Sequence, residues 1–326
     1  MSKLVLTNGD SAASLLEVAG CEGEIVPWRD VLHAGPVPLT PDDDALVDIR
    51  AAFLADGHLL SVETVAADMR ERNSLLDSHN KFETIELWFE HDLYDQLQLV
   101  QILDMLRSRD RFENLVLVQA PDYLGTQTAE TIMRFEELAL LVNETMMATA
   151  SAIWNHFRHE TPERLADKEN RNTPGFLFLR QALERILEEL PGPDGLSRTE
   201  RQILYSINRN IHQPGFLFAR DMNMEEAAFL GDTGFFTILS DLEFCRTPLI
   251  EGLSEPFELE ILSDDERRKA FIGGKVALTA EGKAVLDGDL DHLQINEINR
   301  WLGGTHLKQG SLWRWDETSA VLTGPE

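Results

Sequence analysis

Short apolar runs alternate with amphipathic helical segments over residues 1–125, and this alternation constrains the fold more than any other feature. Apolar residues recur at spacings of four and three from Leu93 to Leu106, the pattern of one helix face. A strand, a helix and a further strand at this spacing favour a right-handed parallel connection. We therefore expect a three-layer α/β domain with a mostly parallel, Rossmann-like or flavodoxin-like sheet. Its predicted strands cover residues 3–7, 24–28, 84–89 and 115–118.

Three further segments follow this domain. Residues 126–194 have helical spacing throughout, with predicted helices over 128–141, 144–157 and 175–190. Residues 195–290 open with the capping-box sequence SRTE and continue with helices, strand-like runs at 248–250, 257–261 and 275–279, and a last helix. This order is expected of a winged-helix-like α+β module. The tail, 291–326, contains two aromatic runs around Trp301 and Trp313, which we expect to pair as a hairpin.

The charge balance limits the partners of the chain. The 326 residues include 29 Lys and Arg against 57 Asp and Glu, a formal net charge of −28. Duplex DNA and anionic lipid both need clustered basic residues, so we expect neither as a partner. No secretory signal or membrane span is evident, and Cys21 and Cys245 form no disulfide or zinc framework. A cytoplasmic location is the resulting expectation.

Polar residues follow the predicted parallel strands, where ligands of open α/β sheets bind. Glu90, His91, Asp92, Asp10 and His33 are the candidate catalytic residues, because carboxylates beside histidine suit acid–base chemistry. Three or more carboxylates could instead hold Mg²⁺ or another divalent cation, although the sequence does not specify a metal. The candidate ligand-binding residues are Asn8, Gly9, Ser11, Arg29, Asp30, Asp95 and Gln96.

A purely structural interpretation competes with this site. Asp92 and Asp95 fit a helix N-cap and first turn, and Asp10 or Ser11 could equally be a cap. Capping gives no reason for Arg29, Glu90 or His91. We therefore expect Asp10, Arg29, Asp30, Glu90, His91 and Asp92 to converge in one concave site.

Known catalytic motifs match poorly. The sequence Gly9-Asp10-Ser11 resembles the opening block of Gly-Asp-Ser-type esterases, but their Asn-containing block is missing. Phosphate-binding loops of the types G-x-G-x-x-G and G-x-x-x-x-G-K-[ST] are also absent. Ser11 at a helix N-terminus could still bind an anion through backbone N–H groups.

The third helix of the winged-helix-like segment, at 233–244, contains no Lys or Arg. It carries Asp241 and Glu243 and follows Asp232. Phosphate would repel such a helix, so this module is expected to contact protein rather than DNA.

Several blocks together resemble a bacterial family, the one numbered 1835 among domains of unknown function. They are NGDS at 8–11, WRDVLHAGP at 28–36, LWFEHDLYDQL at 87–97, GLSRTE at 195–200, RWLGGTHL at 300–307 and WRWD at 313–316. The resemblance covers nearly the whole chain and implies a bacterial protein, but no activity.

Two functional hypotheses remain. In the first, the N-terminal domain binds a small polar or phosphorylated ligand at its strand ends, where Arg29 pairs with an anionic group; in an enzymatic version of this hypothesis it also hydrolyses or transfers that ligand. In the second, the chain is a non-enzymatic regulator or adaptor that uses its acidic winged-helix-like module for protein contacts.

Overall fold

The computed structural model describes residues 2–56 and 60–325, which form two compact units. The first unit contains residues 2–55, 60–185 and 303–305, and the second contains 56, 186–302 and 306–325. The predicted helical segment 126–194 is therefore divided, and most of it belongs to the first unit.

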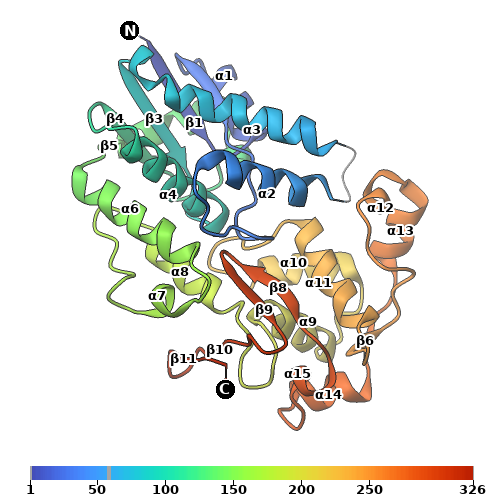
Figure 1. The fold of residues 1–326 in the computed structure, drawn as a ribbon. Helices are drawn as coiled ribbons and strands as arrows, with labels where there is room; N and C mark the ends of the chain where they lie inside the picture. The colour runs from blue at the N-terminus through green and yellow to red at the C-terminus, as the bar shows by residue number, and fades with distance from the viewer. Residues whose placement is uncertain (1, 57–59, 326) are drawn as a thin grey trace. The chain divides into compact units, whose positions relative to one another are not determined.

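A five-stranded sheet in the order β2-β1-β3-β4-β5 organises the first unit (Figure 1). The first four strands are parallel, which confirms a mixed α/β fold with a mostly parallel sheet. They are β1 (Lys3–Thr7), β2 (Glu24–Pro27), β3 (Thr84–Phe89) and β4 (Leu115–Gln119). The edge strand β5 (Leu140–Leu141) is antiparallel to β4.

Helices cover both faces of this sheet. Val5 and Trp88 pack with Ala12 and Leu16 of α1 (Asp10–Val18) in one apolar cluster. Because side chains alternate along a strand, Leu4, Leu6 and Leu87 face the other side. There α4 (Leu93–Ser108) is buried along nearly its whole length and packs against α6 (Glu144–Phe157). Two further helices, α2 (Asp43–Ala55) and α3 (Val62–Asp77), pack against each other (Figure 1).

The predicted helix over 128–141 is wrong in its second half. Residues Ala129–Ile132 form α5, Met133–Leu138 form a 3-10 helix, and the chain then extends into β5. The edge of β4 offers unpaired backbone groups, and pairing them outweighs local helical spacing. Two shorter helices, α7 (Glu163–Ala166) and α8 (Leu179–Leu187), follow α6.

The second unit has a core rich in phenylalanine. Phe235 and Phe236 of α11 (Asp232–Phe244) pack with Phe218 and Phe271. Around them lie α9 (Arg198–Asn208), α10 (Pro214–Met222), α14 (Ala280–Leu286) and α15 (His292–Ile295). Two of the three strand-like runs predicted here contribute strands, and these pair with each other: β6 (Ile250–Glu251) with β7 (Ala277–Leu278).

Two local predictions for this unit are wrong. The run at 257–261 is not a strand: it leads into α12 (Glu260–Ser263) and α13 (Asp265–Gly273), with Phe257 packed on the aromatic core. The aromatic runs of the tail do not pair with each other. Each belongs to its own hairpin, β8 (Asn299–Leu302) with β9 (Thr305–Lys308) and β10 (Arg314–Asp316) with β11 (Val321–Thr323).

Among the described residues, no helix is both long and apolar enough to cross a bilayer.

Candidate functional site

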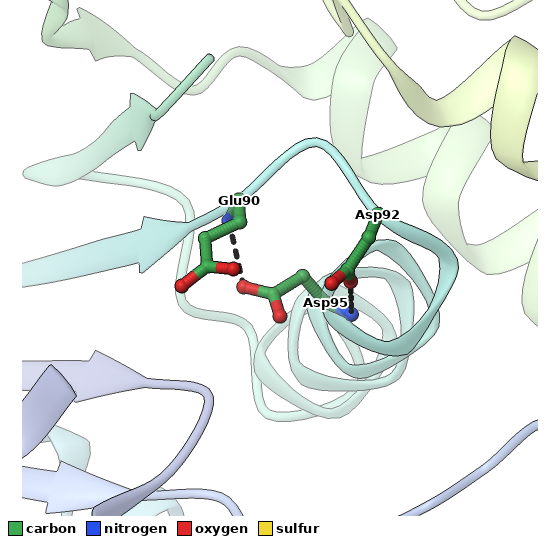
Figure 2. A group of neighbouring side chains, drawn as sticks. All are labelled: Glu90, Asp92 and Asp95. Atoms are coloured by element: carbon green, nitrogen blue, oxygen red, sulfur yellow. Dashed lines mark hydrogen bonds between the residues drawn. The ribbon is translucent and has the colours of Figure 1, made fainter. Parts of the chain in front are cut away.

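Three carboxylates meet where β3 ends and α4 begins. Glu90 directly follows β3, Asp92 is the N-cap of α4, and Asp95 lies in the first turn of that helix. One ligand oxygen from each lies within 4.8 Å of the others. Figure 2 shows the three carboxyl groups turned toward one another across the loop between strand and helix. We call Glu90, Asp92 and Asp95 the carboxylate group.

Capping accounts for part of this geometry. Asp92 Oδ1 accepts from the Asp95 backbone N–H at 3.0 Å, so Asp92 caps α4 as its sequence position suggests. Asp95 Oδ1 in turn accepts from the Glu90 backbone N–H at 2.6 Å (Figure 2). A residue with a capping bond can still ligate a cation, because each carboxylate carries a second oxygen. Capping and binding are therefore compatible here.

Neighbouring strand ends contribute to the same place. Asn8, which follows β1, donates from Nδ2 to Glu90 Oε1 at 3.0 Å and to Asp95 Oδ2 at 2.9 Å. The backbone N–H of Leu124, in the loop after β4, donates to Glu90 Oε1 at 2.6 Å. The carboxyl ends of β1, β3 and β4 thus converge on the carboxylate group, as the parallel sheet predicts.

The carboxylate group is buried, and no described Lys or Arg pairs with it. Its exposed fractions are 4% for Glu90, 8% for Asp92 and 0% for Asp95. None of the three forms an ion pair with a Lys or Arg among the described residues. Burial, then the charge of Asp92, raises the pKa of Glu90 to about 7. Burial and the two neighbouring carboxylates raise the pKa of Asp95 well above its usual range, and burial also raises the pKa of Asp92.

Two more of the predicted site residues, His91 and Gln96, lie beside the carboxylate group. His91 lies with its ring centroid 5.0 Å from that of Tyr123 and 5.9 Å from that of Phe178, and its buried Nδ1 has no hydrogen-bond partner among the described residues. Gln96 is fully buried, and its Nε2 donates to the Glu90 carbonyl at 2.6 Å, while its Oε1 has no partner in the described part of the chain. Buried polar atoms normally bond to protein or to ordered water, so these two atoms can each form a hydrogen bond with a water or with a ligand.

Arg29 and Asp10 pair with each other instead of joining the carboxylate group. Arg29 Nη2 lies 2.7 Å from Asp10 Oδ1, and its Nη1 lies 3.1 Å from Asp68 Oδ1. Each of these side chains is at least two-fifths exposed. Arg29 adopts a positive φ of 53°, an uncommon conformation for a residue with a side chain.

Asp30 is part of the interior, and His33 is half-buried beside it. Asp30 Oδ1 accepts from Nε and Nη2 of Arg50 at 3.1 and 2.7 Å, and both side chains are fully buried. Burial, followed by the charges of Arg50 and Arg185, lowers the pKa of His33 to about 4. His33 is therefore neutral at physiological pH.

Gly9 and Ser11 lie at the start of α1. Gly9 is its N-cap with extended backbone, and a Cβ added there would meet nothing within 4 Å. Ser11 is exposed, and its Cβ lies 3.1 Å from the position of a Cβ added at Gly125. The loop after β4 therefore passes over the first turn of α1.

Sequence reasoning missed two residues that shape the site. Arg50 lies in the middle of α2 and neutralises Asp30. The sequence around Arg50 does not indicate that its side chain is buried. Leu124 acts through its backbone N–H, which no side-chain pattern reveals.

A scan against protein-family models finds no match for this chain, and a search of curated proteins finds none either.

Proposed function

We propose that the first unit binds a divalent cation at Glu90, Asp92 and Asp95, and with it a small polar or phosphorylated ligand at the carboxyl ends of the parallel strands. The single observation that carries the proposal is the burial of three mutually close carboxylates, none of which pairs with a Lys or Arg within residues 2–56 and 60–325. Three buried negative charges strongly disfavour one another and need protons or a cation.

The oxygen ligands favour a hard cation. Mg²⁺ and Mn²⁺ are bound through carboxylate oxygens and commonly keep coordination positions for phosphate oxygens. Hydrogen bonds to the chain occupy Glu90 Oε1 and Asp92 Oδ1, and the second oxygen of each is the one proposed to reach the cation. Asp95, both of whose oxygens accept hydrogen bonds, orients Glu90 and Asn8 as well as adding charge.

His91 and Gln96 support a ligand in addition to the cation. Two buried atoms, His91 Nδ1 and Gln96 Oε1, have no hydrogen-bond partner among the described residues. His91 follows Glu90 in the sequence, and Gln96 donates a hydrogen bond to the Glu90 carbonyl. In the catalytic form of the proposal, a cation held by the carboxylate group would supply positive charge to a phosphorylated ligand, and His91 would exchange a proton with that ligand. In this arrangement Arg29 does not bind the anion, since Asp10 and Asp68 already neutralise it.

Isothermal titration of the full chain with Mn²⁺ tests the cation site. We expect one site per chain, lost in Glu90→Gln and Asp92→Asn and retained in Glu113→Gln, which removes an exposed carboxylate of the same unit. Melting temperatures with nucleotides and sugar phosphates, with and without Mn²⁺, test the ligand, because binding to the native state raises the midpoint. No Mn²⁺ binding would reject the cation, and no cation-dependent ligand shift would reject the phosphorylated ligand.

For the second unit we propose a winged-helix-like arrangement devoted to protein contacts. The order α9, α10, α11, then β6 and β7, supports it, as does the absence of Lys and Arg from α11. Membership of the bacterial family numbered 1835 stays a proposal based on the sequence blocks, and it adds no activity. A gel-shift assay that detects tight, salt-sensitive binding to duplex DNA would contradict the protein-contact role.

A further inference from the structure

The first turn of α1 offers hydrogen-bond donors that the described chain does not use. Gly9 is the N-cap and provides no side-chain cap, and the Ala13 N–H donates to the Gly9 carbonyl at 3.0 Å. Within residues 2–56 and 60–325, the N–H groups of Asp10, Ser11 and Ala12 form no hydrogen bond. Unpaired N–H groups and the helix dipole together make such an end favourable for an anion.

These donors can be reached from solvent. Ser11 is exposed, and Gly9 is half-buried, with nothing within 4 Å of a Cβ added there. A small anion can therefore approach the first turn of α1 without displacing a side chain at Gly9.

Thr7, the last residue of β1, is an independent indication of a ligand at this place. Its side chain is fully buried, and its Oγ1 forms no hydrogen bond in the described part of the chain. Because side chains alternate along a strand, Thr7 faces the same side of the sheet as Val5, which packs with Ala12 of α1. In register Thr7 lies beside Trp88, a member of the same cluster. The Thr7 hydroxyl thus points toward the layer in which α1 begins, and a buried hydroxyl normally has a partner.

The local charges make an anion here dependent on a cation. Arg29 offsets the acidic residue of the first turn, because its Nη2 lies 2.7 Å from Asp10 Oδ1. Asn8 directly precedes Gly9 and donates to Glu90 and Asp95, so the negative carboxylate group lies on the other side of Asn8. A cation bound to the carboxylate group would remove the repulsion that an anion meets there.

We propose that the N-terminus of α1 binds the phosphate group of the ligand, with the Ser11 and Ala12 N–H groups, the Ser11 hydroxyl and the Thr7 hydroxyl as its donors. This inference rests on the proposed function, because it places the phosphate beside the cation of the carboxylate group. The ligand class is inorganic phosphate or a phosphate monoester, bound together with a divalent cation.

Calorimetric titration of the full chain in about 0.15 M salt tests this inference. The titrants are Mg²⁺ alone, inorganic phosphate alone, and inorganic phosphate with saturating Mg²⁺. We expect one phosphate per chain, bound several-fold more tightly with Mg²⁺ than without it. Glycerol 3-phosphate in place of inorganic phosphate distinguishes a monoester from the free ion. The absence of Mg²⁺ binding rejects the cation site, whereas Mg²⁺ binding without phosphate binding keeps that site and overturns this inference.

Two variants locate the phosphate. Ser11→Asp places a carboxylate on the free donors at a position where an acidic residue stabilises a helix, and we expect phosphate to bind about tenfold more weakly or worse. Thr7→Val keeps the shape of the side chain and removes the hydroxyl, and should weaken phosphate binding several-fold. Neither variant should change the affinity for Mg²⁺ alone by more than about twofold.

Ser14→Asp is the matched control, because it adds the same charge at an exposed position one turn further along α1. It should change phosphate affinity by less than about twofold in the same salt. Equal weakening by Ser11→Asp and Ser14→Asp, or phosphate binding that Mg²⁺ does not strengthen, would also overturn the inference.

Discussion

Asp30 and Glu90 both follow a parallel strand of the same sheet and both are buried, but their negative charges are compensated in different ways. Asp30 is fully enclosed with Arg50, which also donates to the carbonyls of Val31 and Ala34. Glu90 has two other carboxylates nearby and no positive partner among the described residues. A fixed arginine makes the first site a permanent part of the fold. The second site requires a cation that can exchange, either protons or a metal ion.

Breaking the permanent pair should have the largest effect. Arg50→Ala leaves Asp30 charged and buried, so we expect the free energy of unfolding of the first unit to fall by about 3–5 kcal/mol. Denaturant titration measures this loss. Arg70→Ala is the matched control, because Arg70 pairs with Asp44 and Asp48 on the surface and its loss should change stability far less than Arg50→Ala. Equal effects of the two variants would contradict the structural role of Arg50.

Removing the Glu90 charge should act in the opposite direction. The pKa of Glu90 is raised to about 7 in the folded state, so folding favours the protonated carboxyl group. The stability that this preference gives is fully present below the pKa of Glu90 in the unfolded chain, and it is lost as pH rises through about 7. Glu90→Gln removes the ionisable group, so the variant does not lose stability in this way as pH rises. Without divalent cations we expect the variant to match the wild type near pH 4.5 and to exceed it by up to about 3 kcal/mol above pH 7. Denaturant titrations across pH measure the difference, and a variant less stable than the wild type at pH 7.5 would make Glu90 a structural carboxylate.

Asn8 connects the end of β1 to the exchangeable site through two hydrogen bonds. Asn8→Ala should lower the free energy of unfolding by about 1–2 kcal/mol, since it leaves buried Asp95 Oδ2 without its donor and leaves Glu90 Oε1 with the Leu124 N–H alone. Ser11→Ala, a few residues along and exposed, should change it by less than about 0.5 kcal/mol. If the Asn8 variant is as stable as the Ser11 variant, these bonds do not order the site.

Arg29 should show the smallest effect. Its partners Asp10 and Asp68 are exposed, so Arg29→Ala should cost less than about 1 kcal/mol, and less still in high salt. Denaturant titrations at two salt concentrations measure this. A loss comparable to that of Arg50→Ala would place Arg29 among the buried pairs.

The sequence predicts strand ends better than side-chain partners. The apolar runs predict the positions of β1 to β4, and the helix between two of these strands predicts that they run parallel. That argument also placed Glu90, Asp92 and Asp95 at one edge, because short-range spacing fixes residues on a strand end and the first helical turn. It expected Asp30 and Arg29 at the same place, but their partners, Arg50 and Asp68, come from α2 and α3. Partners tens of residues away depend on how helices pack, which local pattern does not encode.

The same limit explains the errors in the second unit. Short strand signals such as 257–261 rest on a few apolar residues, and here Phe257 serves the aromatic core instead of a sheet. The tail hairpins show the converse, because each aromatic run found a partner strand nearby in sequence. Local pairing costs less loop entropy than pairing the two runs with each other.

We expect protons and a divalent cation to compete for the carboxylate group. Calorimetric titration with Mn²⁺ in buffers of different ionisation enthalpy counts the protons released when the cation binds. At pH 6 we expect the release of about one to two protons per Mn²⁺, decreasing toward pH 8. Glu113→Gln removes an exposed carboxylate outside the site and should release as many protons as the wild type. Mn²⁺ binding without proton release at pH 6, or no binding at all, would contradict this competition.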